Sequence, residues 1–192
     1  MMAWIDFDKV KPYLTYDNAT SFSVEEQDFI NRLCDAVCKF IENYCGRVIE
    51  QTQVTEFIDG NVGKTFVLSN YPISNLELYY DPNRKFTSET KLTKDTDYFV
   101  SEKTAVVRLN FQPIPEPQVL KAVYMAGWLT DDIPADLVDA ACQFVVYKYD
   151  KVRKNEYDLI TKAGQGASVT FIGPKEEIPP NIKTVLDMYK LW

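Results

Sequence analysis

Hydrophobic residues early in the chain recur at intervals of three and four, the spacing of one face of an α-helix. This run extends from Phe29 to Tyr44. Ser23 and Glu26 stand three residues apart just before the run, as in a capping box, and Gly46 follows it as a C-cap. The pattern therefore predicts an amphipathic helix of about five or six turns with one buried stripe.

From about residue 50 to residue 125 the pattern changes to alternation over short runs, each bounded by turn residues, which is typical of β-strands. The tripeptide 102–104 suits a hairpin turn, and prolines at 113, 115 and 117 predict a stiff extended linker. Short strands at this spacing favour an antiparallel sheet or small barrel over βαβ units. The expected strands are 54–58, 64–68, 76–80, 98–101, 106–109 and 119–125.

The last third of the chain returns to helical spacing. A proline among acidic residues at 131–136 marks a helix start, and apolar residues on one face extend this helix to about Ile160. Residues 164–166 interrupt it with two glycines, and residues 167–172 are expected to form a short strand or an extended arm. Pro179-Pro180 then opens a final helix with one apolar stripe.

These elements predict an α+β fold: a small helical bundle with an inserted antiparallel β region. The bundle comprises the N-terminal helix, the long central helix and the short C-terminal helix, whose apolar stripes are expected to pack together. The expected divisions are 1–49 for the N-terminal helical part, 50–128 for the β region and 129–192 for the C-terminal helices, with a glycine-bracketed loop at 161–173.

Charge and composition exclude several classes of function. The 192 residues carry 28 acidic and 21 basic side chains, a net charge of −7, and no histidine. A Ser-His-Asp triad, a Cys-His dyad and a histidine-ligated metal are therefore excluded. The acidic balance argues against a protein that grips nucleic acid, because affinity for phosphate comes largely from clustered Lys and Arg. No signal peptide or membrane span is indicated, so we expect synthesis in a reducing compartment.

Two motifs resemble ligand sites but have plainer structural interpretations. Gly63-Lys64-Thr65 resembles the end of a P-loop, yet the position of the earlier glycine is Ile58 and a strand pattern follows, which favours a hairpin connector. The cysteines lack the ligand number and loop spacing of a structural zinc site, so we expect them to pack in the core. They are Cys34, Cys38, Cys45 and Cys142.

The densest acidic cluster offers a function of another class. The cluster comprises Asp131, Asp132, Asp136 and Asp139 and is a candidate for a divalent-cation site or for acid–base catalysis. An acidic metal-dependent enzyme would use Asp132, Asp136 and Asp139. Their place at a helix start also suits interaction with the helix dipole, about 0.3–1 kcal/mol per charge, and we favour this interpretation. A third hypothesis is a carbohydrate- or peptide-binding module on the β region, which requires an exposed aromatic pair such as Tyr79 and Tyr98.

The glycine-bracketed segment and the C-terminus are candidates for binding a partner. The segment is β-prone, so it either pairs with the edge of another chain or folds against its own sheet. The aromatics of the last helix either anchor into a partner or complete the core. The candidate residues are Gly164, Gln165, Gly166, Ser168, Val169, Phe171, Tyr189 and Trp192.

A series of short motifs resembles, in order, those of the head–tail connector (head-completion adaptor) proteins of tailed bacteriophages. These motifs describe helix ends, turns and strand ends and cover most of the chain. They are Tyr44-Cys45-Gly46-Arg47, Glu56-Phe57-Ile58-Asp59-Gly60, Leu68, Tyr71-Pro72-Ile73, Asp97-Tyr98, Val106–Leu109, Val123–Trp128, Ile133–Leu137, Ser168-Val169-Thr170 and Pro180–Tyr189.

The resemblance implies a structural virion protein that needs no active site, metal or cofactor. Family members form a ring, commonly of twelve subunits, beneath the portal at the capsid–tail junction, after synthesis in the cytoplasm of the bacterial host. The implied partners are the portal protein, further copies of the chain and the next neck or tail protein. DNA passes through the channel without specific binding, which net negative charge favours. Another neck or tail ring protein is the alternative within this class.

Overall fold

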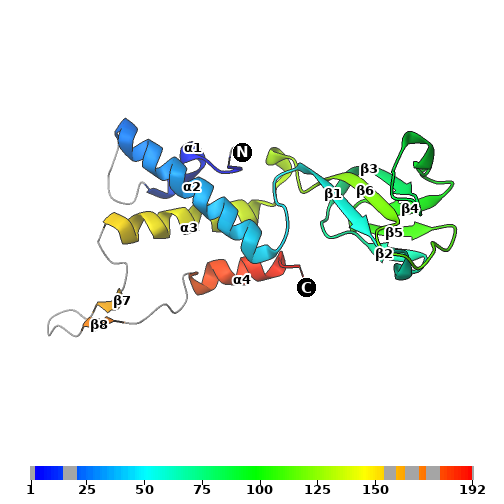
Figure 1. Cartoon of the computed structure of the whole chain (residues 1–192). Helices are drawn as coiled ribbons and strands as arrows, with labels where there is room; N and C mark the ends of the chain where they lie inside the picture. Colours follow the sequence, from blue (N-terminus) through cyan, green and yellow to red (C-terminus); the bar gives the residue numbers. More distant parts are fainter. Residues whose placement is uncertain (1–2, 15–20, 154–158, 163–168, 172–177, 192) are drawn as a thin grey trace. The chain divides into compact units, whose positions relative to one another are not determined.

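The computed structural model places the chain in two compact units (Figure 1). One unit, Met1–Gly46 with Pro134–Trp192, is built on helices, and the other, Arg47–Ile133, is built on β-strands. The predicted α+β class is therefore confirmed. The residues that the structure describes are 3–14, 21–153, 159–162, 169–171 and 178–191.

The long helix near the N-terminus has the ends that its sequence predicts. The backbone N–H of Glu26 donates to Ser23 Oγ at 3.2 Å, and the N–H of Ser23 donates to the Glu26 carboxylate at 2.9 Å. Gly46 closes the helix in the left-handed conformation, with φ 68°. The capping box and the C-cap are thus both confirmed. The helices of this unit are α1 (Phe7–Leu14), α2 (Val24–Cys45), α3 (Ala135–Arg153) and α4 (Pro180–Met188).

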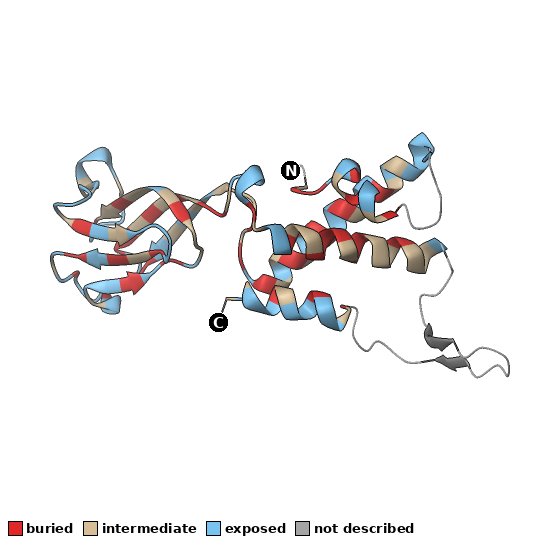
Figure 2. Cartoon of the chain, turned by 180° about the vertical axis from the view of Figure 1, so that it is seen from behind, coloured by how far each residue is buried: buried red, intermediate tan, exposed pale blue. Residues whose placement is uncertain are grey.

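The helical unit is organised around α3, which packs against α1, α2 and α4. Each helix turns a buried stripe toward the others (Figure 2). The predicted packing of the terminal helices is therefore confirmed. The fully buried side chains at its centre include Val10, Ile30, Val37, Ile41, Leu137, Phe144, Val145 and Leu186.

Sequence analysis missed one element of this unit and misjudged the extent of another. Helix α1 was not predicted, because it has only eight residues and contains Pro12, although Phe7 and Val10 follow a helical spacing and are buried. The central helix was expected to reach about Ile160, but α3 ends at Arg153 within the described residues. Further on, β7 (Leu159–Lys162) pairs antiparallel with β8 (Val169–Phe171), so the expected short strand exists and has a partner.

The β unit contains two three-stranded antiparallel sheets, with strand orders β1-β6-β3 and β2-β5-β4. Alternate residues of β6 are buried, as the predicted period of two requires. Inward side chains from both sheets form one hydrophobic cluster, so the sheets share a core. The strands are β1 (Thr52–Ile58), β2 (Thr65–Val67), β3 (Ile73–Tyr80), β4 (Tyr98–Ser101), β5 (Val106–Leu109) and β6 (Leu120–Ala126).

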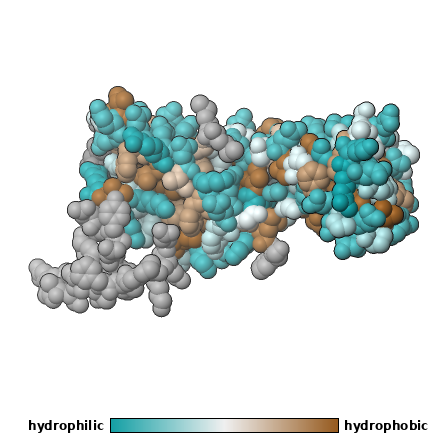
Figure 3. Space-filling model, viewed as in Figure 1, coloured by the Kyte–Doolittle hydropathy of each residue, from teal (hydrophilic) through white to brown (hydrophobic). Residues whose placement is uncertain are grey.

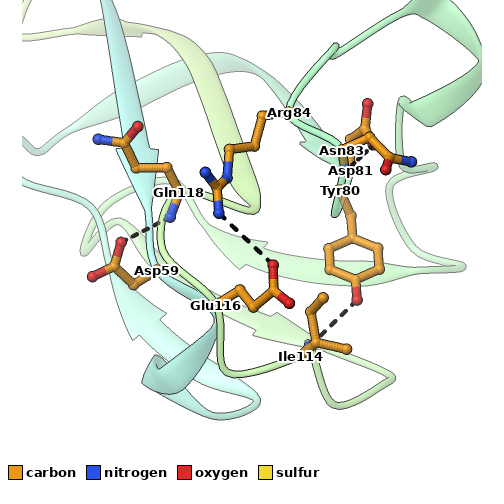
Figure 4. A network of polar contacts seen from close by, with 8 residues as sticks. All are labelled: Asp59, Tyr80, Asp81, Asn83, Arg84, Ile114, Glu116 and Gln118. Carbon is orange, nitrogen blue, oxygen red and sulfur yellow. Dashed lines mark hydrogen bonds and ion pairs between the residues drawn. The ribbon is translucent and has the colours of Figure 1, made fainter.

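The proline-rich segment lies inside the β unit, in the loop from β5 to β6, and does not link the two units. Polar contacts hold this loop against its neighbours (Figure 4). The Gly60 N–H donates to the Glu116 carbonyl at 2.8 Å, and the Gln118 N–H donates to Asp59 Oδ1 at 2.8 Å. Arg84 forms an ion pair with the Glu116 carboxylate at 3.7 Å. The loop is therefore a fixed part of the surface.

Replacement of Gly60 by alanine tests this docking. A Cβ atom at Gly60 would lie 1.6 Å from the carbonyl oxygen of Ile114, so the loop must move. We expect Gly60→Ala to lower the free energy of unfolding by about 2 kcal/mol or more, measured by chemical denaturation. Gly63→Ala is the comparison variant, because nothing lies within 4 Å of its Cβ and only its backbone conformation, φ 78° and ψ −156°, opposes a side chain, at about 1–3 kcal/mol. A Gly60→Ala protein as stable as the wild type would contradict the docking.

Candidate assembly surfaces

The two segments that connect the β unit to the rest of the chain are fastened together by a stacked arginine. The Arg47 guanidinium lies 4.0 Å from the ring centroid of Tyr71 and 4.7 Å from that of Trp128. Arg47 is buried, with 4% of its surface exposed. Main-chain bonds support the stack: the Trp128 N–H donates to the Ile49 carbonyl at 2.9 Å, and the Gln51 N–H donates to the Trp128 carbonyl at 2.7 Å. Sequence analysis named these three side chains in separate motifs but did not predict that they meet.

The helical unit is tied by hydrogen bonds from tyrosine hydroxyls to aspartates on other helices. The bond to Asp139 raises the pKa of Tyr13 to about 12, and the bond to Asp187 raises the pKa of Tyr44 to about 12. The pairs are Tyr13–Asp139 at 2.7 Å between α1 and α3, Tyr44–Asp187 at 2.5 Å between α2 and α4, and Tyr189–Asp136 at 2.7 Å between the end of α4 and α3.

These bonds set a pH range for the attachment of α4. The hydroxyl of Tyr44 lowers the pKa of Asp187, since it donates to the ionised carboxylate. The raised pKa of Tyr44 means that its contribution to stability is complete below the ordinary tyrosine value and is lost as pH rises through about 12. The lowered pKa of Asp187 means that its contribution is present above the ordinary aspartate value and is lost on acidification.

Two members of the acidic cluster, Asp136 and Asp139, take part in the same bonds. Asp136 lies in the first turn of α3, where the dipole interpretation places it, and accepts the Tyr189 hydroxyl. Asp139 accepts the Tyr13 hydroxyl and, at 2.8 Å, the side-chain amide of Gln143. Two of the three carboxylates proposed for catalysis are therefore structural acceptors. In the described parts of the chain, no group of three or more possible metal ligands comes together.

The cysteines, the P-loop-like motif and the tyrosine pair have structural explanations in the fold. All four cysteines are buried, as expected for core residues, and burial raises the pKa of Cys34 and of Cys38 to about 12. The strand β2 begins directly after Gly63-Lys64, where a P-loop requires a helix. Tyr98 is only 2% exposed and donates its hydroxyl to the Leu76 carbonyl, so the exposed aromatic pair with Tyr79 does not exist.

The structure places three of the eight predicted partner-binding residues. Tyr189 is half-buried and engaged with Asp136, so it has a structural role within the chain. Val169 and Phe171 lie on β8. The remaining five lie outside the described residues: Gly164, Gln165, Gly166, Ser168 and Trp192. The partner-binding role of all eight residues stays a prediction.

Apolar groups also lie on the surface of the β unit (Figure 3). On the outer face of β2-β5-β4, Val67 is 59% exposed and Phe99 is 48% exposed. Phe99 is paired in register with Arg108, and these two side chains line a hollow with Lys64. We call Lys64, Val67, Phe99 and Arg108 the basic–aromatic face. Sequence periodicity places these residues on strands, but it does not show which sheet face is covered.

The other sheet has an exposed aromatic group of a different kind. On its outer face the ring of Phe57 packs against that of Phe86, with centroids 5.7 Å apart. The Lys121 ammonium lies 5.5 Å from the ring centroid of Tyr79 and 5.9 Å from that of Phe86. Aromatic and cationic groups are thus matched within this face. Within the described part of the chain, Phe99 has no such ring partner and Arg108 and Lys64 have no ion-pair partner.

Removal of the tyrosine hydroxyls that hold α4 tests the tethers. The double variant Tyr44→Phe/Tyr189→Phe loses two exposed hydrogen bonds, so amide exchange in α4 should accelerate about fivefold or more. Tyr79→Phe is the control, because it removes a tyrosine–carboxylate bond within the β unit and should leave α4 protection unchanged. Hydrogen exchange read by mass spectrometry measures both, and unchanged exchange in α4 of the double variant would show that the hydroxyls do not hold it.

Comparison with known proteins gives a family and a fold. The family model described as "Head completion protein" matches residues 5–192. No curated protein matches the sequence. Within the described residues, no helix has the length and apolar character needed to cross a membrane.

Solved structures with a similar fold come from a gene transfer agent, abbreviated GTA. A chain in the "Neck of native GTA particle computed with C12 symmetry" has a TM-score of 0.58 at 12% identity, covering 96% of this chain and 87% of that one. A chain in the "Neck of empty GTA particle computed with C6 symmetry" has a TM-score of 0.63 at 12% identity, covering 99% and 91%. A chain in the native GTA virion has a TM-score of 0.63 at 11% identity, covering 97% and 89%.

The fold likeness extends over nearly the whole of each chain, so both units take part in it. The family model likewise begins before α1 and ends at the last residue. The motifs on which the resemblance to head-completion adaptors rests fall within that range. The chain belongs to the head completion protein family.

Proposed function

We propose that this protein is a head–tail connector that forms a ring of twelve copies beneath the portal and joins the capsid to the tail. The observation that carries the proposal is the family match over residues 5–192. The fold likeness to chains of a neck computed with C12 symmetry supports the ring and its copy number. The ring extends the DNA channel at the capsid–tail junction of the virion, after synthesis in the host cytoplasm.

The chemistry of the described residues suits a structural role rather than catalysis. Asp136 and Asp139 accept hydroxyls from neighbouring helices and are engaged in holding the bundle. Burial raises the pKa of Cys142 to about 11 and the pKa values of Cys34 and Cys38 to about 12. A protonated thiol is a poor nucleophile and a poor metal ligand. These groups stabilise the fold, and no cofactor is needed for the proposed function.

The net charge of −7 suits a channel through which DNA moves. A surface that is negative overall repels phosphate and does not collect the contacts that hold a duplex in place. DNA therefore passes through without specific binding. The partners that remain in place are the portal on one side, the next neck or tail protein on the other, and the neighbouring copies in the ring.

The β7–β8 hairpin is the element proposed to reach the portal. Its two strands pair only with each other among the described residues, so each has one edge without a neighbouring strand. Such edges accept a strand from another chain. Four of the predicted partner-binding residues fall between these two strands in the sequence: Gly164, Gln165, Gly166 and Ser168. Trp192, the fifth that the structure does not describe, is the last residue.

Electron microscopy of the purified protein mixed with its own portal tests this function. We expect twelve-fold rings stacked on one end of the portal. A variant in which residues 159–171 are replaced by a short Gly-Ser linker should keep the thermal stability of the helical unit and lose the stacking. Tyr79→Phe serves as the control, because it changes one side chain of the β unit, leaves residues 159–171 intact and should retain stacking.

Binding to isolated tails in place of the portal would favour the alternative, another ring of the neck or tail. No association with either particle would contradict the proposed function altogether.

A further inference from the structure

The basic–aromatic face is suited to a protein surface of opposite charge, an inference that rests on the ring of the proposed function. Arg108 and Lys64 are exposed cations in a protein of net charge −7. Among the described residues they have no ion-pair partner, whereas Arg84, Lys91 and Lys94 of the same unit each have one. Phe99 and Val67 add apolar surface beside them. An interface with these groups gains from both charge and burial.

A surface with the complementary composition lies elsewhere in the same unit. Leu129 is 56% exposed, and Asp131 and Asp132 follow it on a 3-10 turn closed by the bond from the Asp132 N–H to the Leu129 carbonyl at 2.8 Å. Both aspartates are exposed, and within the described residues neither carboxylate has a hydrogen-bond or ion-pair partner. We call Leu129, Asp131 and Asp132 the acidic corner.

We propose that the acidic corner of one copy binds the basic–aromatic face of the next copy around the ring. The two carboxylates then face Arg108 and Lys64, and Leu129 packs against Phe99 and Val67. The two surfaces share no residue, so each copy uses one to receive and the other to insert. Such a head-to-tail contact is heterologous, and its repetition closes a ring when the rotation from one copy to the next divides a full turn evenly.

A nucleic-acid backbone is the other occupant that a basic surface suggests. Phosphate recognition relies on clustered cations, whereas this face has only two and sets them beside an exposed phenylalanine and valine. Contact with a phosphate group does not stabilise exposed apolar side chains. A second copy can contact both the cations and the apolar side chains of the face, and its acidic corner supplies the opposite charge. We therefore infer that the occupant is a second copy of the chain.

Charge reversal tests the contact in the full-length protein. Lys64→Glu/Arg108→Glu makes the face acidic, and Asp131→Lys/Asp132→Lys makes the corner basic. In each variant the two contacting surfaces carry the same sign, so self-association followed by analytical ultracentrifugation at low salt should weaken at least tenfold. The exposed pair Lys85→Glu/Lys103→Glu gives the same change of net charge as the first variant and should associate as the wild type does.

An equimolar mixture of the two reversed variants is the decisive sample. An acidic face then meets a basic corner, and a basic face meets an acidic corner, so the variants should assemble in alternation to within about threefold of the wild-type affinity. Recovery in the mixture also shows that both variants are folded. Rings of an even number of copies, twelve included, accommodate the alternation.

The outcomes separate this inference from the proposed function. Wild-type-like assembly of both reversed variants, failure of the mixture to recover, or absence of any wild-type self-association would each overturn the contact. Loss of binding to a short DNA duplex by Lys64→Glu/Arg108→Glu, with assembly unchanged, would overturn it in favour of phosphate. If assembly depends on these charges but the wild-type ring does not bind the portal, the contact stands and the proposed function is contradicted.

Discussion

The β unit depends on the stack in which Arg47 lies between Tyr71 and Trp128. The chain enters this unit at Arg47 and leaves it a few residues after Trp128, so the stack fastens entry and exit together at the base of the sheet. Gly127 makes the close approach there: its φ is 93°, and a Cβ atom would lie 2.6 Å from the Ile49 carbonyl oxygen. The unit that is fastened in this way also has a hydrophobic core of its own, to which both of its sheets contribute.

Different interactions stabilise the two units. In the β unit, inward side chains from two small sheets share one core, and the proline-rich loop is fixed by Gly60 and Glu116. In the helical unit, an apolar core is supplemented by tyrosine–aspartate bonds such as Tyr44–Asp187, which tie short helices to long ones. The acidic side chains of α3 are used in this way. This explains how a chain without histidine, with buried thiols, can serve as a structural component.

The sequence predicted the elements whose signals are local. The capping box of Ser23 and the alternation of β6 each lie within a few residues, and both are confirmed. The failures are of two kinds. Helix α1 is too short, and Pro12 too unfavourable, for periodicity to reveal it. Contacts such as Tyr13–Asp139 join residues far apart in sequence, and the burial of Tyr98 depends on which face the second sheet covers, so neither follows from a local pattern.

The central claim is that this chain joins a DNA-filled head to its tail. Complementation of particles assembled in its absence tests that claim most directly. Heads made without the protein are expected to be filled but tailless, and purified protein added with free tails should restore joined, infectious particles. Particles that join their tails without the protein, or that stay unjoined after its addition, would contradict the account.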